Sequence, residues 1–473
     1  MLFNSSTFLV FFAVVLAVHY SPISWRLKKH SLLWASYLFY AAWNPPFVVL
    51  LWLSTLVDWT AAQRIAISED RRRKRAWLVL SLVSNLGLLA FFKYGNFALE
   101  NLQALLSACG VVYQPPALDI LLPVGISFYT FQTLSYTLDV YFGRAKPWHS
   151  FLDFALYVTF FPQLVAGPIV RATCFLPQCV EPRRATRDQF GWGLMLLLLG
   201  LFQKVVVADA LLAPIVDQVY GTGFGPSGTA AWQGTVAFAG QIFCDFAGYS
   251  SCAIGAAMCL GFSLPENFRF PYAAIGFSDF WRRWHISLST WLRDYLYVPL
   301  GGNRRGAMRT HGNLMATMLI GGLWHGASWT FVVWGGLHGA FLVVERWLRR
   351  HLPERRFWST ALGRLALGAA TFACVCLAWV FFRAESFDQA WEISTAMLGF
   401  GSEIGAGLTR AQAMTVHVVM GALLLSHAAL RNDRLELAVA RLPHWSKALF
   451  ASCLLVLVIH SPGDQRAFLY FQF

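Results

Sequence analysis

The sequence predicts an all-α, polytopic integral membrane protein with about twelve transmembrane helices. Of its 473 residues, 57% are hydrophobic and only 13% are charged, whereas about a quarter of the residues in a soluble protein are charged. Apolar runs alternate along the chain with short basic clusters, which is the pattern of membrane spans and their cytoplasmic flanks. Because no soluble domain and no repeat interrupts this pattern, we expect a single domain over residues 1–473.

Charge and cysteine content exclude several other classes of protein. The net charge of +13 comes from basic residues in separate short clusters and not from one patch, so we expect no nucleic-acid partner. The nine cysteines form no Cys-x-x-Cys pair, and we interpret them as small core residues. The first apolar run lacks a basic start and a small-residue cleavage site, which indicates a retained span.

Basic clusters set the orientation of the first spans. The clusters at 26–29 and 71–75 should be cytoplasmic by the positive-inside rule, which places the N-terminus outside. Gln132, Tyr136 and Asp139 form a polar stripe on one span, and such stripes usually face other helices. The spans of this half are expected at residues 7–22, 31–43, 47–62, 77–92 and 118–141.

Residues 151–170 form an apolar segment with basic residues on both sides, so a full crossing would break the positive-inside rule. The sequence Phe-Pro-Gln-Leu-Val-Ala-Gly-Pro at 161–168 would also free backbone groups at membrane depth. Such groups are tolerated only where protein or water satisfies them. We therefore expect a re-entrant segment that enters and leaves on the cytoplasmic side.

The spans of the second half include one with an acidic residue, Asp245, which lies four residues from Gln241 and from Tyr249. An acid inside a span is a functional-site hypothesis by default, and a hydrogen bond between helices is the alternative. A glycine-rich pair at 313–329 and 332–348 should let two backbones approach closely. The other crossings are expected at 192–207, 231–247, 362–382, 414–430 and 448–459.

Residues 277–305 are expected to form one helix of about twenty residues with two different faces. Ser278 is the expected N-cap, and Pro299 with the glycines after it supplies the stop. Its polar face consists of Arg282, His285, Ser289 and Arg293. Arginines and a histidine are too costly to face lipid, so the helix should lie at an interface or in a protein-lined cavity. We therefore expect a functional site here.

His285 and His325 are the candidate catalytic residues. Each is flanked by tryptophan, and burial disfavours the charged imidazolium, which leaves a neutral base that can take a proton from a hydroxyl. Acyl transfer to an alcohol requires such a base. A hydrogen-bonded core histidine is the alternative for each, and we interpret His338 as a packing residue. No pair of these histidines has the spacing of metal ligands along a helix, so we expect no metal.

Several segments carry a family resemblance. They read DFAGYSSCAIGAAMCLGFSLPENFRFPY at 245–272, DFWRRWHISLSTWLRDYLYVPLGGNRRG at 279–306, GGLWHGASWTFVVWGGLHG at 321–339, LPVGISFYTFQTLSYTLDVY at 122–141 and FFPQLVAGPIVR at 160–171. Together they resemble the membrane-bound O-acyltransferase family, and within it the branch of alginate O-acetyltransferase membrane subunits.

This resemblance implies both an architecture and a reaction. The expected architecture is a ring of spans around thin re-entrant helices, forming a funnel through which an acyl group passes from a cytoplasmic donor to the outer side. His325 would be the essential residue and His285 the second residue of the site. The donor would be an acetyl thioester, with acetyl-CoA expected, and no cofactor would be bound permanently.

The resemblance also implies partners and a location. The acceptor would be an exported polysaccharide such as alginate, reached through a periplasmic acetyl-handling partner protein, and the chain would lie among the lipids of the bacterial inner membrane. We expect Trp324, Ser289, Arg293, Asp245 and Asn303 to support the site or to line the path to it. Two roles stay open for Arg304 and Arg305. They contact the phosphates of the donor, or they are basic residues that flank a span on its cytoplasmic side.

Two other functions stay open on the sequence. One is D-alanyl transfer to teichoic acid from a carrier-protein thioester. The other is a non-enzymatic transporter, whose solute path would be lined by Gln132, Asp139, Gln241 and Asp245. The sequence shows no inverted repeat, which counts against the transporter.

Overall fold

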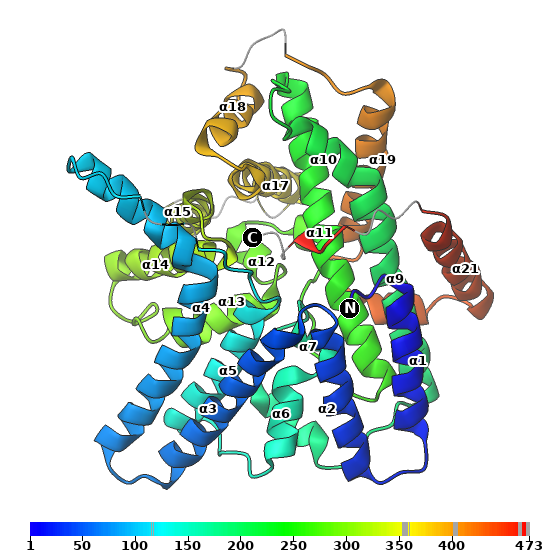
Figure 1. Cartoon of the computed structure of the whole chain (residues 1–473). Helices are drawn as coiled ribbons and strands as arrows, with labels where there is room; N and C mark the ends of the chain where they lie inside the picture. The colour runs from blue at the N-terminus through cyan, green and yellow to red at the C-terminus, as the bar shows by residue number, and fades with distance from the viewer. Residues whose placement is uncertain are drawn as a thin grey trace. The chain divides into compact units, whose positions relative to one another are not determined.

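The computed structural model is helical (Figure 1), and it describes residues 1–473 except 115, 117, 352–357, 359, 401–404, 462–465 and 470–473. These described ranges contain helices and no strands, which confirms the all-α prediction. The chain folds into two compact units, Met1–Leu194 with Ala253–Pro265, and Met195–Cys252 with Glu266–Phe473. The expectation of a single domain stays a prediction.

The first unit contains the helices that correspond to the first five expected spans. Its elements are α1 (Ser6–Tyr20), α2 (Trp25–Ala41), η1 (Pro45–Phe47), α3 (Val48–Ile67), α4 (Arg71–Ala108), α5 (Ile126–Tyr141), α6 (Phe151–Thr159), α7 (Phe161–Leu164), α8 (Ala172–Phe175) and η2 (Leu176–Cys179). Helix α4 begins earlier than expected because Asp70 caps it, accepting a hydrogen bond from the backbone N–H of Arg72 at 2.9 Å. The basic cluster at 71–75 is therefore helical.

Buried polar contacts join neighbouring helices of this unit. Asp58 on α3 accepts hydrogen bonds from Asn85 Nδ2 on α4 at 2.8 Å and from Thr137 Oγ1 on α5 at 3.2 Å. Gln132 Nε2 on α5 donates to the carbonyl of Tyr157 on α6 at 2.6 Å. Buried polar groups need such partners. For Gln132, the prediction that the polar stripe on α5 faces other helices is confirmed.

The apolar segment 151–170 is interrupted where its sequence predicts an interruption. Helix α6 ends at Thr159, and Phe160 leaves the helical conformation with ψ of 110°. The short helix α7 then carries Pro162 in its first turn. The segment is therefore not one continuous helix, and its re-entry on the cytoplasmic side stays a prediction.

The second unit contains the histidine segments. Its elements are α10 (Ala213–Val219), η4 (Pro271–Ala273), α12 (Phe277–Trp281), α13 (Ile286–Leu292), η5 (Arg293–Tyr297), α14 (Ala307–His325), α15 (Trp329–His351), α17 (Ala361–Arg383), α18 (Phe387–Met397), α19 (Arg410–Ala429), α20 (Leu435–Ala440) and α21 (His444–His460). It also contains the π-helix η3 (Phe202–Leu212), and it shares α9 (Arg187–Leu201) and α11 (Gly228–Cys259) with the first unit.

Within the described chain, six helical stretches are long and apolar enough to cross a membrane, and α1 and α21 are shorter apolar helices. The six stretches are Pro45–Ile67, Arg71–Ala108, Arg187–Val219, Gly228–Cys259, Ala361–Arg383 and Arg410–Ala429. The chain is therefore a multi-pass membrane protein. The number of about twelve crossings and the funnel stay predictions, and neither α14 nor α15 is among the six stretches.

The expectation of one helix over residues 277–305 is wrong. Helix α12 stops at Trp281, and α13 begins at Ile286, whose N–H donates to the carbonyl of Asn267 at 2.9 Å and not to the preceding turn. The N-cap of α12 is Gly276 and not Ser278. Because the break rotates the chain that follows it, the two faces expected from a continuous helical period do not form.

Helices α14 and α15 form a hairpin with a close backbone approach, as the glycine-rich sequence predicts. A Cβ atom added at Gly322 would lie 2.3 Å from the carbonyl oxygen of Phe331, and one added at Gly335 would lie 2.3 Å from that of Met318. Small residues at these crossing points bring the helix axes together. This hairpin fixes the position of His325, the last residue of α14.

Replacing Gly322 by alanine is expected to destabilise the hairpin by about 1–3 kcal/mol, because the new methyl group would displace backbone atoms. The matched control is Gly312→Ala on the same helix, where nothing lies within 4 Å of the added Cβ. The melting temperature of the purified protein in detergent should fall for Gly322→Ala and stay the same or rise for Gly312→Ala. Equal melting temperatures would contradict the close approach.

Candidate active site

His285 lies in the break between α12 and α13. Its backbone adopts the left-handed conformation, with φ of 43° and ψ of 54°. Residues other than glycine rarely adopt this conformation, and when they do they cluster at functional sites. The carbonyl of His285 accepts a hydrogen bond from the N–H of Ser289 at 2.9 Å, so the residue also starts α13. The break thus fixes the imidazole at the beginning of a helix.

Asn267 holds the imidazole of His285 in one tautomer. The backbone N–H and the hydroxyl of Ser287 both lie within hydrogen-bond distance of Asn267 Oδ1, at 3.2 and 2.8 Å. Because a backbone N–H can only donate, this Asn267 atom is the acceptor oxygen. His285 Nδ1 lies 3.2 Å from the same oxygen and therefore carries the proton. Nε2 of His285 then holds the lone pair.

His325 lies on the second segment that the sequence predicts to form the site. It ends α14, and the extended backbone of Gly326 turns the chain away from it. A Cβ atom at Gly326 would lie 2.1 Å from the ring of Phe331, so only glycine fits at this turn. The ring centroids of His325 and His285 are 6.4 Å apart. The structure therefore brings together the two histidines that the sequence predicts.

Aromatic rings surround the histidine pair. The ring of Trp324 packs against both imidazoles, with centroid separations of 6.0 Å to His285 and 5.0 Å to His325. Three further rings lie within 5.5 Å of one of the imidazoles, namely Phe246, at 4.7 Å from His285, and Trp334 and Phe382, at 5.0 and 5.4 Å from His325. We define these six residues as the histidine cluster.

The histidine cluster is shielded from solvent. His285 is 0% exposed and His325 is 2% exposed. Burial lowers the pKa of His285 to about 3, because the charged imidazolium would lose its hydration. His285 is therefore neutral at physiological pH, as the sequence predicts for a buried histidine. A neutral imidazole with a lone pair on Nε2 can accept a proton or a hydrogen bond.

His338 lies beside the histidine cluster and is fully buried. Its ring packs against Trp334 at 4.8 Å and Trp281 at 5.1 Å. Neither ring nitrogen has a hydrogen-bond partner within the part of the chain that the structure describes. These contacts favour the interpretation of His338 as a packing residue.

Asp245 belongs to a buried ion-pair group. Lys204 Nζ on η3 lies 2.5 Å from Asp245 Oδ1 and 2.9 Å from Asp209 Oδ1. The N–H of Leu469, near the C-terminus, donates to Asp245 Oδ2 at 3.0 Å. This arrangement favours the contact between helices that was the alternative for Asp245. The next residue, Phe246, nevertheless contacts His285, so the ion-pair group supports one wall of the cluster.

The other predicted residues lie outside the histidine cluster. Ser289 and Arg293 line a cavity of about 500 Å³ that the residues after His285 help to form. Asn303 lies in the turn after η5, where its Oδ1 accepts a hydrogen bond from the hydroxyl of Tyr297 at 2.6 Å. Arg304 and Arg305 follow it with exposed side chains and are not among the residues that line the cavity.

Sequence reasoning missed Asn267 and Lys204. Asn267 lies two residues after Pro265, between Glu266 and Phe268, and nothing in its local pattern separates it from a loop residue. Lys204 had a usable signal, because a lysine within the apolar run 192–207 needs a buried acidic partner. Asp245, on another apolar run, is that partner.

A comparison with models of protein families matches residues 145–387 to the membrane-bound O-acyltransferase family. The match spans all six residues of the histidine cluster and Asn267. The chain belongs to this family. As a member of the membrane-bound O-acyltransferase family it is an acyltransferase, and the resemblance carried by its histidine segments is confirmed.

Curated relatives agree with membership of the family. A probable alginate O-acetylase of Azotobacter vinelandii is 41% identical over 422 residues, which cover 88% of this chain and 82% of the relative. A peptidoglycan O-acetyltransferase of Helicobacter pylori is 34% identical over 524 aligned positions, covering 100% of this chain and 98% of the relative. A teichoic acid D-alanyltransferase of Bacillus subtilis is 27% identical over 288 residues, covering 56% of this chain and 70% of the relative.

The histidine cluster offers this acyltransferase a base in dry surroundings. Neutral imidazoles can remove a proton from an attacking hydroxyl, and the aromatic rings exclude the water that would compete with it. Low polarity also strengthens the few hydrogen bonds that a substrate makes there. The arrangement therefore suits transfer of an acyl group to an alcohol, and the roles of the individual residues stay proposals.

Proposed function

We propose that this chain is an O-acetyltransferase that takes acetyl groups from a cytoplasmic thioester, acetyl-CoA, and passes them toward an exported polysaccharide on the outer side of the membrane. The observation that carries the proposal is the pair of buried histidines, 6.4 Å apart between ring centroids, within the region matched to the family. Family membership supports acyl transfer, and the names of the relatives that are 41% and 34% identical favour acetyl as the acyl group.

In the proposed reaction His325 is the general base. It takes the proton of the acceptor hydroxyl as the hydroxyl oxygen attacks the thioester carbonyl. An ester C–O bond forms, the C–S bond of the thioester breaks, and the departing thiolate receives the proton from His325. Asn267 keeps the proton of His285 on Nδ1. Nε2 of His285 is then a hydrogen-bond acceptor, so this residue orients a hydroxyl or an N–H and does not polarise the carbonyl. General base catalysis supplies about two to four orders of magnitude in rate.

The proposed final acceptor is a glycan hydroxyl of an exported polymer, with alginate as the first candidate. The relatives named for alginate and for peptidoglycan both cover most of this chain, and both polymers are built from sugars with free hydroxyls. The polymer would be reached through a periplasmic partner that receives the acetyl group, with this chain in the inner membrane.

The two alternatives are less well supported. The D-alanyltransferase relative is 27% identical and covers only 56% of this chain. A transporter would need Gln132 and Asp245 to line a solute path, but Gln132 donates to a backbone carbonyl and Asp245 pairs with Lys204. The two polar groups therefore have structural partners within their own units.

Deleting the gene for this chain is expected to remove ester-linked acetate from the secreted polysaccharide of the bacterium that carries it, and wild-type complementation should restore the acetate. The measurement is acetate released from the purified polymer by mild alkali. Acetate lost only from peptidoglycan would change the acceptor, and D-alanine lost instead would favour the alternative enzyme. Unchanged acyl content in every polymer would contradict the proposed function.

A further inference from the structure

The segment that carries His285 is paired with an earlier segment of the second unit. The backbone N–H of Arg269 donates to the carbonyl of Arg283 at 2.9 Å. The backbone N–H of Ile286 donates to the carbonyl of Asn267, also at 2.9 Å. This pairing brings the side chain of Asn267 to Nδ1 of His285. The tautomer and orientation of His285 therefore depend on what holds the two segments in place.

Each of the two segments contains a residue with a strained backbone. Among the residues other than glycine that the structure describes, Phe270 and His285 are the two with a positive φ, of 45° and 43°. Such a conformation persists only where the surrounding contacts fix it. Asn267 supplies one of these contacts for His285. The other contacts show what positions the imidazole.

The side chain of Arg283, two residues before His285, ties the two segments to helix α12. Its Nε donates to Oδ1 of Asp279 on α12 at 2.9 Å, and its Nη1 donates to the carbonyl of Arg269 at 3.3 Å. The side chains of Arg283 and Asp279 are only 12% and 13% exposed. Charge-assisted hydrogen bonds of this kind are stronger than neutral ones.

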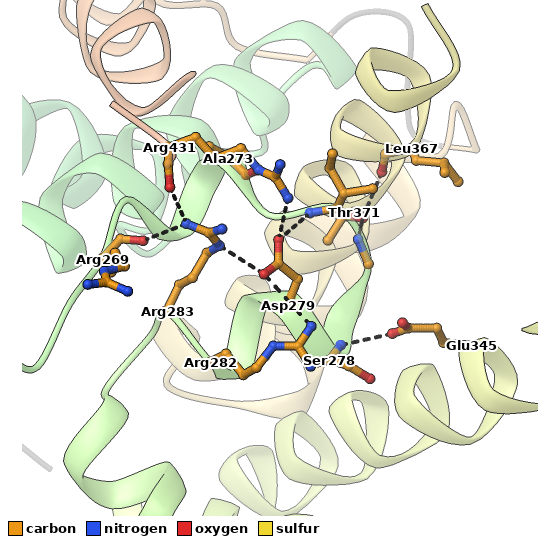
Figure 2. A network of polar contacts seen from close by, with 12 residues as sticks. Arg269, Ala273, Ser278, Asp279, Arg282, Arg283, Glu345, Leu367, Thr371 and Arg431 are labelled. Atoms are coloured by element: carbon orange, nitrogen blue, oxygen red, sulfur yellow. Dashed lines mark hydrogen bonds and ion pairs between the residues drawn. The ribbon is translucent and has the colours of Figure 1, made fainter. Parts of the chain in front are cut away.

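Arg431, which follows the end of α19, holds this arrangement from a distant part of the chain. Its Nη2 donates to Oδ2 of Asp279 and its Nε donates to the carbonyl of Ala273, both at 2.8 Å. The carbonyl of Arg431 accepts a hydrogen bond from Nη1 of Arg283 at 2.9 Å. Figure 2 shows Arg431 and Arg283 meeting at Asp279. Both oxygens of this carboxylate are therefore engaged by arginines.

His427, in the last turn of α19, holds the chain just after Phe270. Its Nδ1 accepts a hydrogen bond from the backbone N–H of Tyr272 at 3.3 Å, and its ring lies 5.7 Å from that of Phe270. The end of α19 thus contacts the chain next to both strained residues, through His427 beside Phe270 and through Arg431 before His285.

We propose that Arg431 is a positioning residue for His285. By fixing Asp279 and Arg283, it keeps Asn267 where its Oδ1 meets Nδ1 of His285. This inference rests on the proposed function, because a fixed imidazole matters for transfer only if His285 orients a reacting group. Arg431 itself acts through these contacts and touches neither histidine of the site.

Replacing Arg431 by glutamine should lower the kcat of acetyl transfer in membrane vesicles about tenfold, because the imidazole of His285 remains but loses its fixed orientation. The double variant His285→Ala/Arg431→Gln should be no slower than His285→Ala, since a residue that acts through another adds nothing once the other is removed. Arg431→Lys keeps a charge beside Asp279 without the guanidinium fork, so it should recover part of the rate.

Arg441→Gln is the matched control for this experiment, because it makes the same change at an exposed side chain of the same region and should leave the rate at the wild-type value. Losses that multiply in the double variant would overturn the proposal, since Arg431 would then act independently of His285.

A spectroscopic measurement separates this inference from the proposed function. Nitrogen NMR of the purified full-length protein with isotope-labelled histidines reports which ring nitrogen of His285 carries the proton, whatever the acceptor or the transfer rate, and His285→Gln assigns the signal. Wild type should show a proton on Nδ1 alone. Arg431→Gln should show a mixture of the two tautomers, and Arg431→Lys a smaller change in the same direction.

The melting temperature shows whether each Arg431 variant is folded. If Arg431→Gln does not fold, Arg431→Lys decides the outcome by the same signal. A His285 signal identical to that of wild type in the folded variants would overturn the inference, even if acetyl transfer were confirmed. A mixed tautomer would support it, even if the reaction proved to be a different acyl transfer.

Discussion

Replacing His325 by alanine is expected to reduce acetylation of the exported polymer to background. His325 is 2% exposed and lies within contact distance of Trp324, Trp334 and Phe382, so no water can replace the lost base efficiently. Loss of a general base lowers the rate by about two to four orders of magnitude. The measurement is ester-linked acetate on the polymer secreted by cells that carry the variant.

Two controls separate lost chemistry from lost protein in this experiment. Immunoblots of the membrane fraction should show normal amounts of the His325→Ala protein. His338→Gln, which alters a buried histidine next to the cluster, should reduce acetylation much less. If His338→Gln removed acetylation and His325→Ala did not, the assignment of the base would be reversed.

Replacing His285 by alanine should lower transfer about a hundredfold while leaving measurable turnover, because loss of an orienting group misplaces the reactants without removing the base. Its partner Asn267 lies 3.2 Å from Nδ1, and Asn267→Ala should cause a smaller loss by releasing the ring. Since the two residues act as one unit, the double variant should be no worse than His285→Ala. Losses that multiply would show that Asn267 acts independently of His285.

The helices of the first unit could be predicted well from the sequence. Hydropathy and basic clusters locate α1, α2, α3 and α4, because these signals depend on local composition. The interruption near Pro162 was also predictable, since proline and glycine act on the backbone where they stand. Helix boundaries were less predictable, as shown by the first turns of α4, which depend on the cap at Asp70.

The break at His285 could not be predicted from local pattern. The spacing of residues 277–305 fits a continuous helix, but the left-handed backbone of His285 is held by Asn267, which lies 18 positions earlier. A tertiary contact therefore overrides local propensity. The same holds for the cavity that Ser289 and Arg293 line, because its other arginines, Arg269, Arg282 and Arg283, come from the chain before α13.

The identity of the two histidines was predictable from residue type and from the family resemblance, whereas their geometry was not. Tryptophan neighbours and apolar surroundings indicate buried, neutral imidazoles at His285 and His325. Which nitrogen of His285 carries the proton depends on Ser287 and Asn267 together. No spacing rule in the sequence contains that information.

The most direct test of the central claim is acetyl transfer from a radiolabelled acetyl thioester in membrane vesicles that contain this chain, its partners and the acceptor polymer. With wild-type protein, label should pass from the thioester to the polymer. With His325→Ala at equal abundance, label should remain on the thioester, and with His338→Gln most of the transfer should persist. Wild-type transfer by His325→Ala would contradict the account.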